Sequence, residues 1–319
     1  MDERKIRKTT FPLVDGHCDS IAGHVAGEWD LTVGGGRLSL PMLRQAGVAV
    51  QFFACFVKED GKPESLILRG LELVEGCRRL IAENPADLCL LETAARLDEV
   101  LDTGKTAILL SVEGGKILGG KLFMLSLLYR LGVRSLILTW NYANDLAGGV
   151  REPGGLTTFG RDVVREMDRL GMLVDVSHLS DPAFWDVLDV SVRSVIASHS
   201  CCRSLYDHPR NLTDGQIKAL AEQGGVIGIN FYTEFLTGGK AALEDVVRHV
   251  DHVCSLVGPD FVGLGSDFDG CESLPVGLEN AGCLPALMQA LLDRGYSEEN
   301  TAKIAGGNFL RVIRQVLAD

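Results

Sequence analysis

The chain lacks the sequence features that mark several large classes of protein. Its 319 residues contain 31 Lys and Arg against 43 Asp and Glu, a formal net charge of −12, and no basic stripe interleaved with aromatic residues. This charge argues against nucleic acid or an anionic membrane as the main partner. No apolar run reaches the roughly 20 residues needed to cross a bilayer. Neither G-x-G-x-x-G nor G-x-x-x-x-G-K-[ST] follows a strand-like run, so nothing supports nucleotide binding.

The cysteine pattern and the two ends of the chain also exclude some possibilities. The nine Cys are odd in number and scattered, with no C-x-x-C pair, which favours a reduced protein over a disulfide framework. The first ten residues are polar and charged, and residues 311–319 carry several charges. We therefore expect neither a secretory signal nor a lipid-anchor tail. Together these features predict a cytoplasmic protein.

What the chain has in abundance is apolar sequence arranged in short runs. It is 46% hydrophobic and 23% charged, which is enough to bury a large core. Several runs are nearly continuous, as is typical of parallel strands that are buried on both faces. The predicted strands are 11–16, 48–57, 106–112, 134–139, 172–177, 194–198, 225–231 and 261–266. Helical spacing lies between them, clearest over 65–83 and 158–170, with further helix starts at 181, 213 and 297.

Eight strands that alternate with helices predict an α/β fold, a single (β/α)8 TIM-type barrel that forms one catalytic domain over residues 1–319. An open doubly wound sheet is the alternative. The Gly-rich segments 34–36, 114–120 and 148–155 are expected to be loops at the strand ends, where substrates bind in barrels.

The most informative motif is Asp15-Gly16-His17-Cys18-Asp19, at the end of the first predicted strand. Alternate side chains of an extended segment point to the same side, so His17 and Asp19 project together and Cys18 points away. An imidazole and a carboxylate on one face at a strand end make half of a metal site.

Four more polar residues follow apolar strands in the same way. Glu113, His178, His199 and Asp267 each end or directly follow a predicted strand. The strand exits of a barrel all open on one mouth, so we expect these side chains to meet His17 and Asp19 there. Six groups exceed the three protein ligands that a catalytic zinc usually takes. Two metal ions that share a carboxylate fit the number better, and Glu113 is the natural bridge.

Other polar residues near these motifs are interpreted differently. Asp269, before Gly270, is expected to cap the next helix or to support the site without binding metal. His249 and His252 fall on a polar helical segment without a third ligand, so we expect a solvent-exposed face there. His24 is expected on a loop or helix near the site.

With these residues in place, the chain resembles the membrane dipeptidase (renal dipeptidase) family of binuclear zinc peptidases over nearly its whole length. The resemblance rests on seven words in order: Asp15-Gly16-His17-x-Asp19, Val112-Glu113-Gly114-Gly115, Asp175-x-x-His178, Ser198-His199-Ser200, Arg210-Asn211, Asn230-Phe231-Tyr232 and Gly265-x-Asp267-Phe268-Asp269-Gly270. It implies a (β/α)8 fold and a metallo-dipeptidase whose partner is a small dipeptide, with tolerance for a D-residue at the C-terminal position. It also implies a soluble, microbial-type relative, which could form a homodimer.

The resemblance also implies roles for individual residues. It implies two Zn²⁺ per chain, with His17 and Asp19 on one ion, His178 and His199 on the other, and Glu113 bridging. It implies that Asp267 handles protons near a bridging hydroxide. It implies that Arg210 holds the terminal carboxylate of the substrate, a task that suits a planar guanidinium. Tyr232 is expected to line the substrate site.

One position departs from the family pattern. Where the family commonly has a His that contacts the scissile carbonyl, this chain has Trp140, whose indole offers a single N–H donor. Asn141 or Asn144 could supply a replacement donor. The departure leaves two alternatives open: a related barrel hydrolase that acts on another amide or a lactone, and a catalytically impaired protein that only binds metal or ligand. The retained Asp267 argues against the second alternative.

Overall fold

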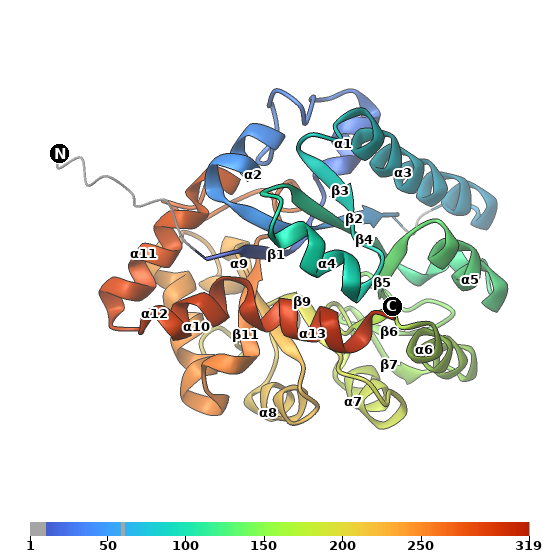
Figure 1. Ribbon diagram of the computed structural model, residues 1–319. Helices are drawn as coiled ribbons and strands as arrows, with labels where there is room; N and C mark the ends of the chain where they lie inside the picture. The colour runs from blue at the N-terminus through green and yellow to red at the C-terminus, as the bar shows by residue number, and fades with distance from the viewer. Residues whose placement is uncertain (1–10, 59–60, 319) are drawn as a thin grey trace.

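The computed structural model describes residues 11–58 and 61–318, and its centre is a closed parallel barrel (Figure 1). Eight strands pair in the order β2-β1-β11-β10-β9-β8-β5-β4, and pairing of β2 with β4 closes the ring. These strands are β1 (Leu13–Cys18), β2 (Val48–Phe56), β4 (Thr106–Glu113), β5 (Val133–Ile137), β8 (Leu173–Asp175), β9 (Ile196–Ser200), β10 (Val226–Asn230) and β11 (Val262–Gly265). Each overlaps one of the eight predicted runs, with bounds that differ by a few residues. The (β/α)8 prediction is therefore confirmed, and the open-sheet alternative is wrong.

Three further strands were not predicted. β3 (Leu88–Leu90) pairs with the first residues of β4 outside the ring. The Gly-rich segment 148–155, expected to be a loop, contributes to the antiparallel hairpin of β6 (Ala147–Gly149) and β7 (Glu152–Leu156). These strands were missed because β3 is only three residues long and because Gly and Pro dominate the hairpin, residues that are depleted in strands.

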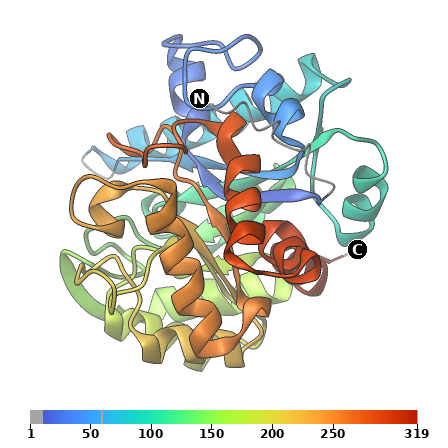
Figure 2. The ribbon, with the colours of Figure 1, turned by 90° about the vertical axis from the view of Figure 1, so that its left-hand side faces the viewer.

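Helices surround the barrel (Figures 1 and 2). The predicted helices over 65–83 and 158–170 are confirmed as α3 (Pro63–Glu83) and α6 (Thr158–Leu170). The others are α1 (Ser20–Ala26), α2 (Leu40–Ala46), α4 (Ala94–Leu101), α5 (Leu122–Arg130), α7 (Asp181–Val190), α8 (Asp214–Glu222), α9 (Thr233–Leu236), α10 (Leu243–Val257), α11 (Leu284–Arg294), α12 (Glu298–Ala302) and α13 (Asn308–Val316). The structure describes no helix that is long and apolar enough to span a bilayer.

The last helical segment differs from the single helix predicted from residue 297 onward. A π-helical stretch, Lys303–Gly307, separates α12 from α13. At Gly306 a Cβ atom would lie 2.8 Å from the Val14 side chain, so the backbone presses against the start of β1. Phe309 of α13 packs on Phe52 of β2, with ring centroids 5.7 Å apart. Together α13 and the π-helical stretch close the end of the barrel where the strands begin.

Two apolar clusters show which residues face the barrel interior. The inner cluster contains alternate residues of the strands, such as Val50 and Phe52 of β2 and Leu109 of β4, together with Phe309. The residues between them, such as Phe53 and Leu110, belong to the larger cluster between barrel and helices. This alternation follows from the two-residue period of a strand.

The interior is narrow beside β9. A Cβ atom at Gly16 of β1 would lie 2.8 Å from the Ser198 carbonyl oxygen, and one at Gly228 or Gly265 would overlap the same oxygen. Pairing between β10 and β9 shifts register at this level, between Ile227 and Ile229. The β9 backbone therefore enters the barrel interior, into space that stays free because β1, β10 and β11 have glycines at this level.

Candidate metal centre and substrate site

Five side chains with metal-binding atoms gather at the mouth, where the barrel strands end. His17 Nε2 lies 3.2 Å from Asp19 Oδ2 and 3.4 Å from Glu113 Oε2. His178 Nε2 lies 2.9 Å from both Glu113 Oε1 and His199 Nε2. All five side chains belong to buried residues. The structure thus brings together the residues predicted as metal ligands, and Cys18 points away from them into the outer core.

Glu113 lies between the two groups of ligands. Its Oε2 faces His17 and its Oε1 faces His178. Burial raises the pKa of Glu113 to about 7, against the opposing effect of His17. A carboxylate with so little access to water is costly to hold ionised unless a cation lies near it. This placement fits the bridging position expected for Glu113.

The two histidines of the second group point their Nε2 atoms at each other. His178 Nδ1 donates to Asn141 Oδ1 at 2.9 Å, and His199 Nδ1 lies 2.8 Å from Ser198 Oγ. The Ser198 hydroxyl also interacts with the Asp175 carboxylate, which favours Ser198 Oγ as the acceptor from His199. Each Nε2 then carries a lone pair, and burial lowers the pKa of both rings well below the usual value. Two lone pairs 2.9 Å apart repel each other, and a shared cation would stabilise the arrangement.

The first group shows the same need for a cation. Asp19 Oδ1 is buried and has no hydrogen-bond partner among the described residues. Burial lowers the pKa of His17, but the carboxylates of Asp19 and Glu113 outweigh that effect and hold it well above its usual value. The His17 ring stacks on His199, with centroids 3.8 Å apart. Imidazole and carboxylate donors in this arrangement suit zinc and related divalent metals.

Asp267 stands beside the first group. Its Oδ1 lies 3.9 Å from His17 Nε2, and its Oδ2 accepts a hydrogen bond from Asn230 Nδ2 at 2.9 Å. Burial raises its pKa, while the charge of His17 opposes the rise. Asp267 and His178 have φ angles of 61° and 69°, the left-handed region that non-glycine residues rarely occupy. Such strain is common at functional sites.

Asp269 takes the supporting position that was expected of it. Its Oδ2 accepts from Ser20 Oγ at 2.6 Å, and its Oδ1 accepts from the Arg37 backbone N–H at 2.7 Å. These bonds tie the loop after β11 to α1 and to the segment before α2. Asp269 therefore fixes the frame around Asp267.

Arg210 is a buried cation on the loop after β9. Only 4% of the residue is exposed, and its Nη2 donates to the His199 carbonyl at 3.0 Å. It forms no ion pair with a carboxylate in the part of the chain that the structure describes, and its Nε is a buried donor without a partner there. Burial lowers its pKa, against the opposing charges of Asp267 and Glu113. A buried guanidinium with unused donors beside the candidate metal ligands is suited to binding a carboxylate.

Tyr232 and Trp140 lie at other points of the same mouth. Tyr232 follows β10, and its ring packs edge-on against Phe235 at 4.8 Å. Burial and the neighbouring Glu272 carboxylate raise its pKa. Trp140 follows β5 and packs on Phe56 at 5.3 Å. Phe56 was not predicted as a site residue, although it ends β2 and is paired with Glu113 of β4.

Asn141 and Asn144 have structural partners that their sequence position did not reveal. Asn141 holds His178, as described above, and its carbonyl oxygen accepts from the Arg151 N–H at 2.8 Å. Asn144 Nδ2 donates to the Leu138 carbonyl at 2.9 Å. At Gly149 of β6 a Cβ atom would lie 2.7 Å from the backbone of Asn141. The β6–β7 hairpin thus supports the residue that orients His178.

We expected His249 and His252 to lie on a solvent-exposed face, and this prediction is wrong for His249. His249 is 1% exposed, because its face of α10 packs inward. Its Nδ1 accepts from the Cys202 N–H at 3.1 Å, and its Nε2 donates to the Leu236 carbonyl at 3.1 Å. Burial lowers its pKa to about 4, so the ring is neutral. His252 is partly buried and contacts Asp214 at 2.8 Å. His24 lies on α1, where its Nδ1 accepts from Leu31 N at 3.4 Å.

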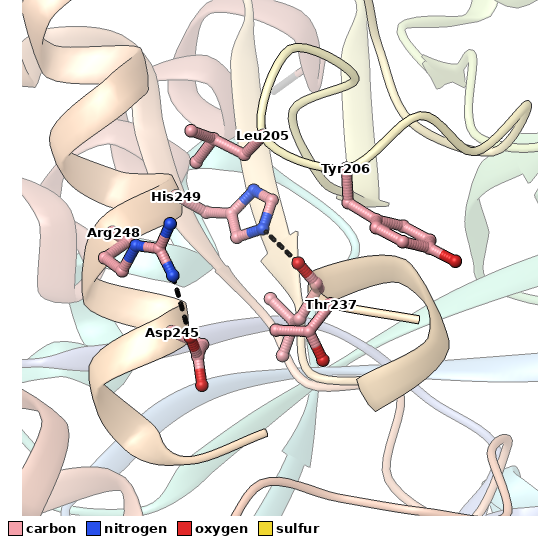
Figure 3. A pocket seen from close by; sticks show the side chains of 7 residues that line it. Leu205, Tyr206, Thr237, Asp245, Arg248 and His249 are labelled. Atoms are coloured by element: carbon pink, nitrogen blue, oxygen red, sulfur yellow. Dashed lines mark hydrogen bonds and ion pairs between the residues drawn. The ribbon is translucent and has the colours of Figure 1, made fainter. Parts of the chain in front are cut away.

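His249 borders a cavity of about 170 Å³, separate from the metal centre (Figure 3). Leu205 and Tyr206, on the loop that leads to Arg210, form one wall, and Arg248 of α10 forms another. In Figure 3 the His249 ring points from α10 between these walls. None of the predicted metal ligands lines this cavity.

Replacing His249 by Leu is expected to lower the free energy of unfolding by about 2–4 kcal/mol. Leu fills similar space but leaves the Cys202 N–H and the Leu236 carbonyl without partners, and each such group costs about 1–3 kcal/mol when buried. Urea unfolding followed by circular dichroism measures the change. Because His252 is partly exposed, H252L is the matched control and should cost less. Equal losses would contradict the internal role of His249.

Comparison with known proteins gives the family. The fold and site place the chain among barrel proteins whose mouth is built for divalent metals. The chain belongs to the membrane dipeptidase family, peptidase family M19, whose profile matches residues 2–318. Dipeptidase 3 of Mus musculus is 34% identical over 96% of this chain, and the uncharacterized dipeptidase C965.12 of Schizosaccharomyces pombe is 35% identical over 86%. The chain spans 64% and 70% of the length of these relatives.

Two solved structures agree over the entire barrel. A dipeptidase AC described as a metallopeptidase superposes with a TM-score of 0.92 and 29% identity, covering 98% of this chain and 100% of that one. A metallopeptidase from Rhodobacter sphaeroides superposes with a TM-score of 0.90 and 29% identity, covering 97% of this chain and 100% of that one. The second structure holds a phosphinate mimic of the dipeptide L-Ala-D-Ala.

Proposed function

We propose that this protein is a metal-dependent dipeptidase that uses two zinc ions. The observation that carries the proposal is Glu113, whose two buried oxygens face different histidines at the mouth of the barrel. The Arg210 guanidinium, which donates to the His199 carbonyl and has no carboxylate partner among the described residues, supplies the second half of the argument. Membership of the dipeptidase family agrees with both.

Five clustered side chains would supply the protein ligands for two ions. His17 and Asp19 would hold one ion, His178 and His199 the other, and Glu113 both. Two zinc ions in these positions would lower the pKa of a shared water to give hydroxide near neutral pH, and would polarise the scissile carbonyl. Asn141 and Ser198 would keep His178 and His199 in the tautomer that leaves Nε2 free.

Asp267 would move the proton in the reaction. Its carboxylate lies within 3.9 Å of His17 Nε2, so it reaches the space between the ligand groups. It would take a proton as water attacks the peptide carbonyl and would give that proton to the leaving amine. Asn230 holds the carboxylate in place by its hydrogen bond to Oδ2.

Replacing Arg210 by Ala is expected to raise KM for dipeptides by about 30-fold or more, because losing one partner of a buried charged hydrogen bond costs about 2–5 kcal/mol. The measurement is steady-state kinetics on Ala-Ala and on its C-terminally amidated form, which carries no terminal carboxylate. Arg210→Lys is the matched variant and should recover only part of the loss. If the parent enzyme cleaves both substrates equally well, Arg210 has a different role.

The direct test of the proposed function is amine release from L,L and L,D dipeptides by the zinc-loaded protein. The mimic bound by the Rhodobacter sphaeroides neighbour leads us to include L-Ala-D-Ala. Cleavage that a chelator abolishes and zinc restores would support the proposal. Bound zinc without cleavage of any dipeptide would contradict it and would favour another amide or a lactone as substrate.

We also place the protein in a reducing compartment, such as the cytoplasm. All nine cysteines are free thiols, and six of them are buried. Labelling of thiols in freshly isolated protein tests this point, because a disulfide-bonded pair would lower the number of reactive groups after unfolding.

A further inference from the structure

We propose that Phe56, Trp140 and Tyr142 form an aromatic wall that binds a bulky apolar side chain on the N-terminal residue of the dipeptide. This inference rests on the proposed dipeptidase function and assigns part of its specificity. The three rings are contiguous: Phe56 and Trp140 lie 5.3 Å apart and Trp140 and Tyr142 lie 6.2 Å apart, between ring centroids.

The wall borders the candidate metal centre. Phe56 is the register partner of Glu113 across β2 and β4, and registered residues of neighbouring strands point to the same side of a sheet. Four register pairs earlier, and so on the same face of the sheet, Phe52 and Leu109 both belong to the interior cluster. Phe56 therefore faces the mouth beside Glu113. The Trp140 ring packs on Phe56 and so lies at the mouth too.

Asn141, the residue after Trp140, also places this segment beside the candidate metal centre. Asn141 bonds to His178 Nδ1 at 2.9 Å, so the segment that carries the wall also touches a predicted metal ligand. Gly149 allows the hairpin backbone to approach Asn141 and Trp140 closely. The wall is thus fixed by the same contacts that orient His178.

The order of strands around the barrel assigns the wall to one end of the substrate. β2 and β9 are four steps apart in either direction around the ring, so Phe56 and the Arg210 loop stand on opposite sides of the mouth. Glu113 ends β4, which lies between β2 and β5 in the ring. A dipeptide with its carboxylate on Arg210 and its peptide bond near Glu113 would therefore extend its N-terminal residue toward the wall.

The chemistry of the wall selects an apolar group. Tyr142 is 47% exposed, and Trp140 and Phe56 are partly buried, so aromatic surface is open to a ligand. A substrate side chain that covers it would gain from burial and from ring contacts. We therefore expect Phe-Ala to be cleaved with a kcat/KM at least about 10-fold above that of Ala-Ala, within the range that apolar pockets provide.

The test compares Phe-Ala, Ala-Ala and Ala-Phe as substrates of the zinc-loaded protein and of W140A. The Phe-Ala to Ala-Ala ratio of kcat/KM should fall about 10-fold in W140A, while the Ala-Phe to Ala-Ala ratio stays the same. F56A should act similarly, and W140F should keep most of the preference. W185A removes a Trp that is 45% exposed on α7 and should leave all ratios unchanged. An unchanged Phe-Ala ratio in W140A, or a change confined to Ala-Phe, would overturn the proposal.

Binding separates failure of this inference from failure of the proposed function. The D267N variant is chosen because it should bind dipeptides without turnover. Calorimetry with zinc-loaded D267N should give a Kd for Phe-Ala about 10-fold below that for Ala-Ala. The double variant D267N/W140A should lose this difference. Tighter binding of Phe-Ala with no cleavage by the parent protein would contradict only the dipeptidase activity. Equal Kd values would overturn the aromatic wall.

Discussion

Asp267→Asn is expected to lower kcat for dipeptide hydrolysis by about 10²–10⁴-fold, the usual contribution of a positioned acid or base. The amide cannot take the proton from water or pass it to the leaving amine. Asn tolerates the left-handed backbone that Asp267 adopts, and its oxygen can still accept from Asn230. Zinc content and urea stability should therefore stay close to those of the parent, measured on the same preparation as kcat.

Asp269→Asn is the control for this variant. Asp269 also has a positive φ, 64°, but its carboxylate bonds to Ser20 and Arg37 outside the ligand groups. The change should lower stability modestly and leave kcat within a few-fold of the parent. A D267N enzyme with two zinc ions and full activity would refute proton transfer by Asp267.

Glu113→Gln should have the second large effect, on metal binding itself. An amide keeps one carbonyl oxygen and replaces the other with an NH₂ group, which does not bind a cation. The variant is expected to hold fewer than two zinc ions per chain after dialysis and to lose about 10³-fold or more in kcat, since each ion supplies several kcal/mol of stabilisation. Atomic emission on dialysed protein gives the zinc count.

Glu152→Gln makes the same chemical change on the exposed tip of the β6–β7 hairpin. It should leave zinc content and kcat unchanged. Two tightly bound ions and parental activity in E113Q would show that Glu113 does not bridge.

The barrel was predictable because its eight strands are long enough or apolar enough to stand out from the segments around them. Near-continuous apolar runs such as 106–112 indicate strands that are buried on both faces, because in a parallel barrel one face of each strand packs on the interior and the other on the helices. β3 and the β6–β7 hairpin could not be found this way. Their few residues are held by pairing with strands already in place, and Gly148, Gly149 and Gly154 carry no periodic signal.

The location of the candidate ligands was predictable for a similar reason. A His or a carboxylate directly after an apolar strand is placed at the mouth by topology alone, so His17, Glu113, His178 and His199 could be expected to meet. The residues that orient these ligands could not be predicted from the sequence. Asn141 lies in a loop whose path depends on the hairpin, and His249 lies on a helix whose rotation depends on its packing against neighbouring elements.

The narrow interior beside β9 has a consequence for where the imidazoles meet. β1 and β9 are three steps apart around the ring, yet the imidazole rings of His17 and His199 stack with their centroids 3.8 Å apart. Gly16, Gly228 and Gly265 leave room for the Ser198 carbonyl inside the barrel, and the next residue, His199, reaches His17. These glycines therefore act as spacers that set the separation of the two groups of candidate ligands, although none of them has a side chain that can bind metal.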